Sequence, residues 1–191
     1  ELELTNYATV LASTPLTHKA RIQENSSWSC SHGVGRWSEN CGCVIDPRRS
    51  GQQEWRRTLR NAMNALRDEI AEFYVKRMGA LGEDPWEIRN RYVAHLISQE
   101  SGRPQVADPI GDGSERETVK GLLELQRHAS MMFTSCGWFF DDAGGLEAMQ
   151  ILRYAHRAIR LHEELGGTSL ESFFLEHIDP LESNDLNVSD G

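Results

Sequence analysis

Apolar residues recur at three- and four-residue steps along residues 53–78, and this regularity restricts the fold more than any other feature of the chain. Such spacing places the apolar side chains on one face of a long helix and leaves the arginines and glutamates on the other. No part of the chain shows the strict alternation of apolar and polar residues that a half-buried strand would have. The sequence therefore predicts an all-α fold. The residues of the predicted stripe are Trp55, Leu59, Ala62, Met63, Leu66, Ile70, Phe73 and Met78.

Capping signals and glycines indicate where further helices begin and end. An apolar pattern that starts at Leu146 should stop at Leu165, because glycines follow at 166–167. Trp55 and Trp86 fall on helical stripes, so we expect both in the core. Residues 1–191 are predicted to form one domain, a bundle of about five to six helices. Three capping boxes give predicted helix starts: Asp84 with Glu87 and with Pro85 at the first helical position, Ser114 with Glu117, and Thr168 with Glu171.

Two segments, residues 24–46 and 133–145, fall outside the helical pattern. Both carry glycines and aromatic residues, and each contains cysteine and tryptophan. Irregular segments that hold unusual side chains on a helical scaffold are typical places for binding residues. The sequence therefore predicts two irregular functional loops, with function where they meet.

Charge and hydropathy restrict the class of partner. The 29 acidic and 20 basic residues give a formal charge of −9, which opposes binding to nucleic acid or to an anionic membrane surface. No apolar run approaches the roughly 20 residues of a membrane span. The first residues, ELELTNYATV, show neither an initiator Met nor a signal-peptide pattern. We therefore expect an excised C-terminal part of a longer chain.

The cysteine content indicates a reducing compartment. Cys30, Cys41, Cys43 and Cys136 are too few for a disulfide scaffold at this length, and a bond between Cys41 and Cys43 would be strained. Free or metal-bound thiols in the cytoplasm are the expectation.

A metal site is one use for these thiols. Cys30, His32, Cys41 and Cys43 lie within a short span and are ligand types of tetrahedral zinc, the candidate cofactor. Cys136 is a possible fourth thiolate from the second segment, with His32 as the alternative fourth ligand. Against a metal, the Cys-x-Cys spacing is tighter than zinc sites usually have. Reduced thiols packed in the interior are the competing interpretation.

The polar and aromatic residues of the two segments have two interpretations. Trp28, Trp37 and Trp138 could stack on sugar rings, while His32 and Arg36 donate hydrogen bonds to hydroxyls. Alternatively, the tryptophans wedge the loops against the helices, Arg36 satisfies loop carbonyls and His32 is structural. The sequence alone leaves both open.

Three stretches resemble a known family: ENSSWSCSHGVGRWSENCGC, MFTSCGWFFDD and GLEAMQILRYAHRAI. They are similar to the helical domain of unknown function that follows the catalytic barrel in a subset of glycoside hydrolase family 57 proteins. The likeness runs from about His18 to the segment LESNDL. It implies a retaining, α-glucan-active parent enzyme whose helices pack on the barrel near its active site. Ser27 departs from the pattern, because many members carry an aspartate there.

The resemblance implies an accessory domain that completes the carbohydrate-binding cleft of an upstream catalytic barrel. The barrel would be its partner in the same chain, with an α-glucan as ligand. Retaining glycosidases need two carboxylates about 5 Å apart, which this family carries in the barrel, so no catalytic residue is assigned here. We expect the isolated chain to be inactive and the parent to be a retaining hydrolase or a glucanotransferase. The substrate-binding residues expected are Trp28, His32, Arg36, Trp37, Trp138, Asp141 and Asp142.

Two other functions compete with this one. The chain could be a metal-stabilised interaction domain without sugar contact, or an enzyme that uses its thiols or a metal. Cysteines gathered around one point with buried tryptophans would favour the interaction domain, and an exposed thiol of low pKa would favour the enzyme.

Overall fold

The computed structural model describes residues 2–49, 51–101, 108–110 and 113–184 of the chain. These residues contain helices and connecting segments but no strand, which confirms the predicted all-α class. The helices are α1 (Tyr7–Ser13), α2 (Trp55–Ala80), α3 (Pro85–Ser101), α4 (Arg116–Met131), α5 (Cys136–Phe139), α6 (Leu146–Glu164) and α7 (Glu171–Ile178), with short 3-10 helices η1 (Gly35–Trp37) and η2 (Pro47–Arg49).

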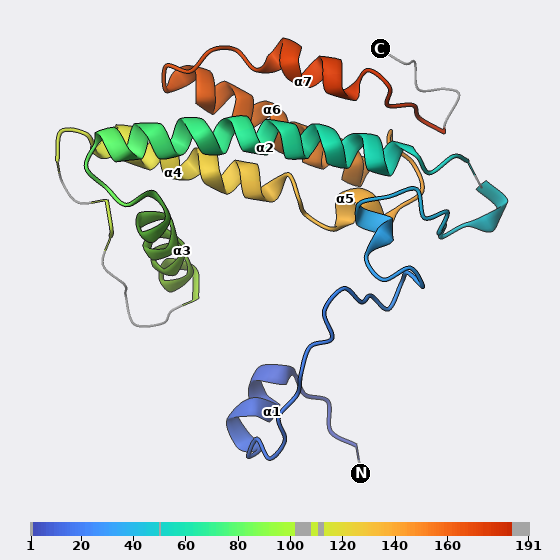
Figure 1. Cartoon of the computed structure of the whole chain (residues 1–191). Coiled ribbons are helices and arrows are strands. Elements are labelled where there is room, and N and C mark those ends of the chain that lie inside the picture. The colour runs from blue at the N-terminus through green and yellow to red at the C-terminus, as the bar shows by residue number, and fades with distance from the viewer. Residues whose placement is uncertain (1, 50, 102–107, 111–112, 185–191) are drawn as a thin grey trace.

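The bundle is built around α2. Figure 1 shows this helix running the length of the bundle, with α4 and α6 beside it and α7 along its other side. The apolar stripe predicted for residues 53–78 faces inward, because Leu59, Met63, Leu66 and Ile70 are fully buried. These residues pack against the apolar faces of α4 and α6 in one continuous core.

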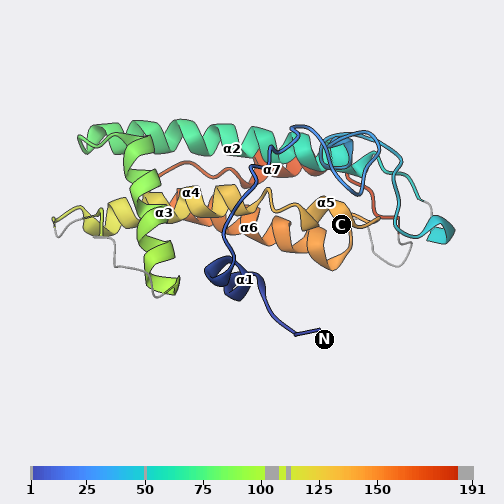
Figure 2. The same ribbon diagram turned by 90° about the horizontal axis from the view of Figure 1, so that it is seen from below.

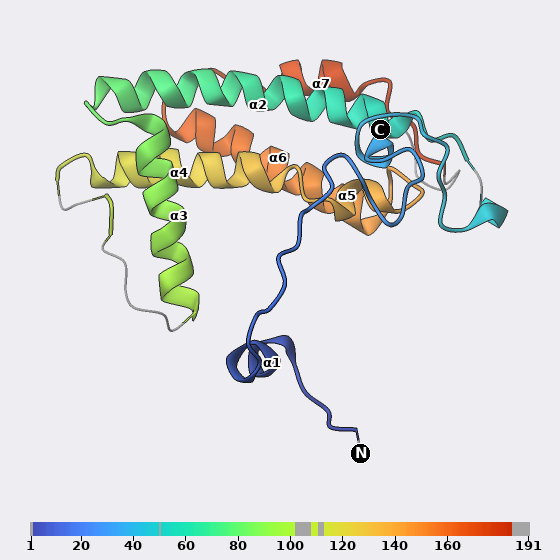
Figure 3. The same ribbon diagram turned by 60° about the horizontal axis from the view of Figure 1, so that its bottom comes forward.

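Helix α3 turns away from this core. Figures 2 and 3 show it crossing the end of α4 at a steep angle. A second, smaller apolar cluster joins it to the bundle through Tyr74, Ile88, Tyr92 and Leu122. The Tyr74 hydroxyl also donates a hydrogen bond to the carbonyl of Pro85, at 2.6 Å. Leu96, farther along α3, packs against the same cluster.

Some predicted helix ends are confirmed and others are wrong. Asp84 caps α3, since its Oδ1 accepts hydrogen bonds from the backbone N–H groups of Trp86 and Glu87 at 3.0 and 2.8 Å. Helix α6 ends before Gly166, whose φ of +87° closes the turn as predicted. The starts predicted at Ser114 and Thr168 are wrong.

Helix α4 begins at Arg116 and α7 at Glu171, and neither has a side-chain cap. At α4, the turn before the helix is closed by the backbone instead, where Arg116 N donates to Gly113 O at 3.1 Å. At α7, Leu170 is buried in the core, so the chain must enter the core before the helix can turn.

Trp86 was expected in the core, but the structure leaves it partly exposed. The Trp86 ring is 42% exposed, because α3 leaves the bundle and the ring lies over Tyr74 at its edge. Helix α1 was not predicted; Asn6 caps it, accepting from Thr9 N at 3.0 Å. It buries none of its residues, and Figures 1 and 3 show it apart from the bundle at the end of an extended stretch. None of the described helices is both long and apolar enough to cross a membrane.

Candidate metal centre

The two irregular segments meet at the end of the bundle formed by α5 and the start of α2. The 3-10 helix η1 contacts both helices. Trp37 Nε1 donates to the carbonyl of Ser135 at 2.9 Å, and Arg60 Nε donates to the carbonyl of Trp37 at 2.6 Å. Arg36 is buried and donates to the carbonyl of Phe139 at 2.5 Å and to that of Ser29 at 3.2 Å. The segment around η1 is thus tied to both helices through its polar groups.

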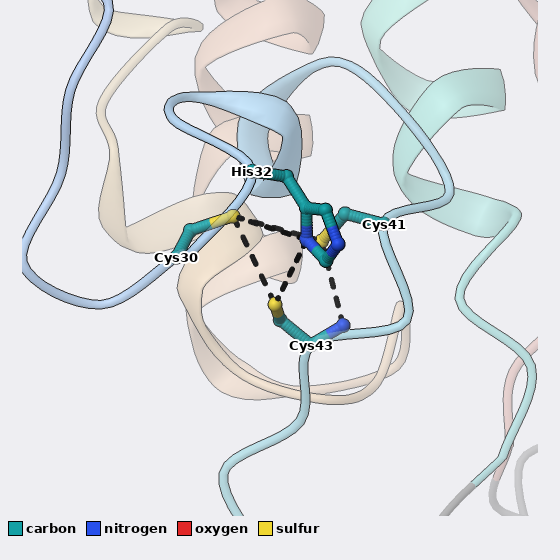
Figure 4. A group of neighbouring side chains, drawn as sticks. All are labelled: Cys30, His32, Cys41 and Cys43. Atoms are coloured by element: carbon teal, nitrogen blue, oxygen red, sulfur yellow. Dashed lines mark hydrogen bonds between the residues drawn. The ribbon is translucent and has the colours of Figure 1, made fainter.

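Four metal-ligating side chains gather within this segment. The sulfur atoms of Cys30, Cys41 and Cys43 and a ring nitrogen of His32 all lie within 4.8 Å of one another. Figure 4 shows the side chains converging from two arms of the loop. Cys30 is buried, Cys41 and Cys43 are half-buried, and His32 is exposed, so the group lies at the surface with one side covered.

The distances inside the group match the edges of a zinc tetrahedron. Zn–S bonds of about 2.3 Å and a Zn–N bond of about 2.0 Å give S–S edges of about 3.8 Å and S–N edges of about 3.5 Å. Cys30 Sγ lies 3.8 Å from Cys43 Sγ and 4.0 Å from Cys41 Sγ. His32 Nδ1 lies 3.5 Å from Cys43 Sγ and 4.0 Å from Cys30 Sγ. These are four of the six distances between the donor atoms, and the other two, from Cys41 Sγ to Cys43 Sγ and to the His32 ring, are at most 4.8 Å.

Two glycines make this convergence possible. Gly42 has a φ of +71°, and the turn allows Cys43 N to donate to Cys41 Sγ at 3.4 Å while both sulfurs face inward. The tight Cys-x-Cys spacing is therefore compatible with a shared site. Gly33, also at +71°, approaches the carbonyl of Asn25 so closely that a Cβ would lie 2.4 Å from the oxygen. Any other residue at either position would strain the loop.

The surroundings shift the pKa values of Cys30 and Cys43 in opposite directions. Burial raises the pKa of the Cys30 thiol, but the backbone N–H groups of Arg36 and His32 and the side chains of His32 and Cys43 outweigh it and lower this pKa to about 7. Burial, followed by the neighbouring Cys30 and Cys41 side chains, raises the pKa of Cys43. Hydrogen-bond donors at Cys30 favour its thiolate, which is the form that ligates a metal.

Arg56, near the start of α2, connects the cluster to the second segment. Its guanidinium is fully buried and donates to the carbonyls of Cys43, Phe140 and Trp138 at 2.7, 3.0 and 3.1 Å. It also lies 3.9 Å from Cys41 Sγ and 3.5 Å from Asp141 Oδ1. If a divalent ion were bound, three thiolates and a neutral imidazole would leave a charge of −1, and Arg56 would be a cation beside the site that it shares with Asp141.

Cys136 does not belong to the group. It is exposed on α5, and the prediction that it supplies a fourth thiolate is corrected by the position of His32. The physical reason is the direction of α5, which places Gly137 and Trp138 in the core and leaves the Cys136 side chain toward solvent.

The residues predicted to bind sugar are distributed between surface and interior. Trp28 is 92% exposed, with its ring 5.9 Å from that of Phe139. Trp138, by contrast, is fully buried, and its Nε1 donates to the carbonyl of Arg56 at 3.1 Å. Trp138 and the buried Arg36 therefore have no free surface for a ligand, and their predicted binding role is corrected to a structural one. Trp37 is half-buried, with its ring nitrogen engaged.

The two aspartates hold neighbouring chain segments in place. The Asp141 carboxylate accepts hydrogen bonds from Ile45 N at 2.7 Å and from Asp46 N at 2.9 Å. The Asp142 carboxylate accepts from the Ser183 hydroxyl at 3.0 Å and from Asn184 N at 2.7 Å. Both side chains are used as clamps between the second segment and other parts of the chain.

Arg56 is the functional residue that reasoning from sequence missed. Its position in the helix did carry a signal, because it lies three residues before the buried Leu59 and so falls on the apolar face of α2. A cation on the apolar face of a helix needs buried partners.

Comparisons with known proteins give one match. Residues 52–191 fit the model of a family described as a domain of unknown function (DUF3536). Comparisons with the curated proteins and with the solved structures give no match. The matched region contains Arg56, Asp141 and Asp142, whereas the four clustered ligands lie before it. Since the match covers well over half of the sequence, the chain belongs to the DUF3536 family.

Proposed function

We propose that Cys30, His32, Cys41 and Cys43 bind a structural zinc ion, and that the chain is a zinc-stabilised helical domain. One observation carries the proposal: four donor atoms of zinc-ligand type gather within 4.8 Å of one another, and four of their six distances, at 3.5–4.0 Å, lie near the edges of a zinc tetrahedron. The ion would fasten the segment containing η1 onto the end of the bundle.

The number of ligands favours a structural role over a catalytic one. Structural zinc sites have four protein ligands, whereas catalytic sites keep a position open for water or substrate. Here the chain itself supplies all four, as three sulfurs and one nitrogen. This set of soft ligands suits zinc better than the oxygen-preferring cations.

The composition of the segment explains why a metal would be needed. Between residues 27 and 43 only Cys30, Gly35 and Arg36 are buried. So little buried apolar surface contributes little to folding. Metal binding can supply that free energy instead, as it does in small zinc domains.

The test is metal analysis of the purified chain with two serine variants. We expect one equivalent of zinc per chain, loss of that zinc in Cys43→Ser, and full retention in Cys136→Ser, whose thiol lies outside the group. Cobalt in place of zinc should give the absorption bands of tetrahedral thiolate coordination. Substoichiometric metal after incubation with zinc, or equal zinc in both variants, would show that the proposal is wrong.

The exposed Trp28 favours a second function, the sugar-binding wall implied by the resemblance to family 57 glycoside hydrolases. Its ring is almost wholly exposed beside Phe139, and Phe140 is 42% exposed close by. Flat apolar rings of this kind stack on the C–H faces of sugars. We infer that, in a longer parent chain, this aromatic surface would face the cleft of an upstream catalytic barrel. The isolated chain would then not hydrolyse α-glucans, because the barrel would hold the two catalytic carboxylates.

A further inference from the structure

A hollow lies between α3 and α4, where α3 diverges from the bundle. Its volume is about 500 Å³, within the range of small-molecule sites. Leu96 of α3 and Leu123 and Met131 of α4 form apolar parts of its wall. None of the residues that line it belongs to the proposed zinc site, so the two features are independent.

One buried amide nitrogen in the wall has no hydrogen-bond partner among the described residues. Gln126 is 6% exposed, and its Nε2 donates no hydrogen bond to any part of the chain that the structure describes. A buried donor left unpaired is costly and therefore rare in native proteins. The amide of Gln53, which is also buried, does have partners, the carbonyls of Gly51 and Asp141. An acceptor from outside the chain would satisfy Gln126.

Two arginines make the hollow locally cationic, although the whole chain is acidic. The Arg89 guanidinium lies over the Trp86 ring, 4.6 Å from its centroid, and forms no ion pair with a carboxylate in the described residues. Arg127 reaches Glu124 Oε2 at 3.3 Å and keeps further N–H donors. The other oxygen of Glu124 accepts from the Tyr92 hydroxyl at 2.6 Å. Glu124 itself is not part of the wall, so the charged groups that line the hollow are both positive.

We propose that this hollow binds a small organic carboxylate with an apolar body. The carboxylate would accept hydrogen bonds from Gln126 Nε2, the unpartnered buried donor, and from the guanidinium of Arg89 or Arg127, the two cations of the wall. The body would lie along Leu96, Leu123 and Met131 and remove their apolar surface from water. The unpartnered amide nitrogen favours an acceptor, and the apolar part of the wall favours an apolar body.

Calorimetric titration of the zinc-loaded chain with octanoate, below its micellar concentration, tests the proposal. We expect saturable binding of one octanoate per chain, and at least about tenfold weaker binding of octanol, which has the same body without the charge. Equal binding of both, or no saturable binding of octanoate at millimolar concentrations, would overturn the proposal.

Variants assign the binding to this hollow. Gln126→Leu removes the donor, and because that donor has no partner the variant should fold with an unchanged or higher thermal midpoint. Gln126→Leu and Arg89→Gln should each weaken octanoate binding about tenfold or more. Arg153→Gln, which removes the same charge from an exposed site on α6, should leave the affinity unchanged. Wild-type affinity in both Gln126→Leu and Arg89→Gln would contradict the assignment. Zinc content measured on the same samples keeps this result separate from the metal proposal.

Discussion

Arg56 Nη1 donates a 2.7 Å hydrogen bond to the carbonyl oxygen of Cys43, so a cation of the bundle core holds the backbone of a proposed metal ligand. The same guanidinium binds the carbonyls of Trp138 and Phe140, which belong to the second irregular segment. One side chain of α2 therefore sets the position of both loops and the charge beside the cluster.

Arg56→Met should destabilise the chain and weaken metal binding together. Truncation leaves one buried and two partly buried carbonyls without their donor and Asp141 without its ion-pair partner, so we expect a loss of about 3–5 kcal/mol in the free energy of unfolding. Zinc affinity should fall about 10- to 100-fold, as when other outer-shell partners are removed. Urea unfolding and competition with a zinc chelator measure the two effects.

Arg57→Met is the matched control for that variant. Arg57 is about half exposed and, among the described residues, pairs with Glu54 on the helix surface, so its loss should change stability by about 0.5 kcal/mol or less. Equal effects of Arg56→Met and Arg57→Met would mean that the buried guanidinium does not organise the site.

Asp142→Asn should loosen the contact between residues 183–184 and the second segment. The variant keeps the shape of the side chain but removes the charge that accepts hydrogen bonds from Ser183 and Asn184. We expect a loss of about 1.5–3 kcal/mol in unfolding free energy. Asp68→Asn, at an exposed site beside Arg67, should have almost no effect. Thermal or urea unfolding of Asp142→Asn and Asp68→Asn measures the difference. Equal stability of the two variants would show that Asp142 does not hold residues 183–184 in place.

Trp28→Ala and Trp138→Ala should separate a surface role from a packing role. Removal of the fully buried Trp138 should cost about 3–5 kcal/mol, whereas removal of the exposed Trp28 should cost about 0.5 kcal/mol or less. In a longer parent enzyme, Trp28→Ala should instead lower kcat/KM for an α-glucan. If Trp28→Ala changes neither stability nor kinetics, the aromatic surface has no part in substrate binding.

The stability of the chain should depend on pH through His162. Burial lowers the pKa of His162, an effect that the hydrogen bond to the Thr168 carbonyl partly offsets. In the unfolded chain, where a histidine has a pKa of about 6.5, His162 therefore binds its proton at a higher pH than it does in the folded chain. Stability from this residue is fully present above about pH 6.5 and is lost as the pH falls toward the lowered folded value.

Urea unfolding between pH 5 and pH 8 tests this dependence. Burial also lowers the pKa of His128, so the slope of wild type alone does not isolate His162. His162→Gln should have a shallower decline below about pH 6.5 than wild type. His156→Gln, at an exposed position of the same helix, should decline as wild type does. Parallel declines in all three proteins would exclude His162 as the cause.

The long helices were predictable because their apolar spacing is a local property. The stripe at residues 53–78 became α2, and the pattern from Leu146 became α6, each within a few residues of the expected ends. The start of α3 was predictable for the same reason, since Asp84 caps it through its own neighbours. Signals of this kind act within a few residues and need no knowledge of the rest of the fold.

Features that depend on tertiary packing could not be predicted in this way. Trp86 and Trp138 are both aromatic residues near helix starts, yet one lies at the edge of α3 and the other in the core, because α3 diverges and α5 does not. The choice of His32 over Cys136 depends on the turn at Gly42 and on the direction of α5. The sequence contained the residue types of the cluster, but only the three-dimensional path of the loop decides which of them come together.

Because α1 lies apart from the bundle, its amide hydrogens should exchange with solvent at a different rate from those of the bundle helices. A helix of seven residues without buried side chains is marginal in water, so α1 should exchange almost as fast as an unfolded peptide. The buried stripe of α2 should exchange only when the bundle opens. Between these two regions lies the segment with the clustered cysteines, whose protection would follow its zinc: slow when the metal is bound, and fast once a chelator has removed it.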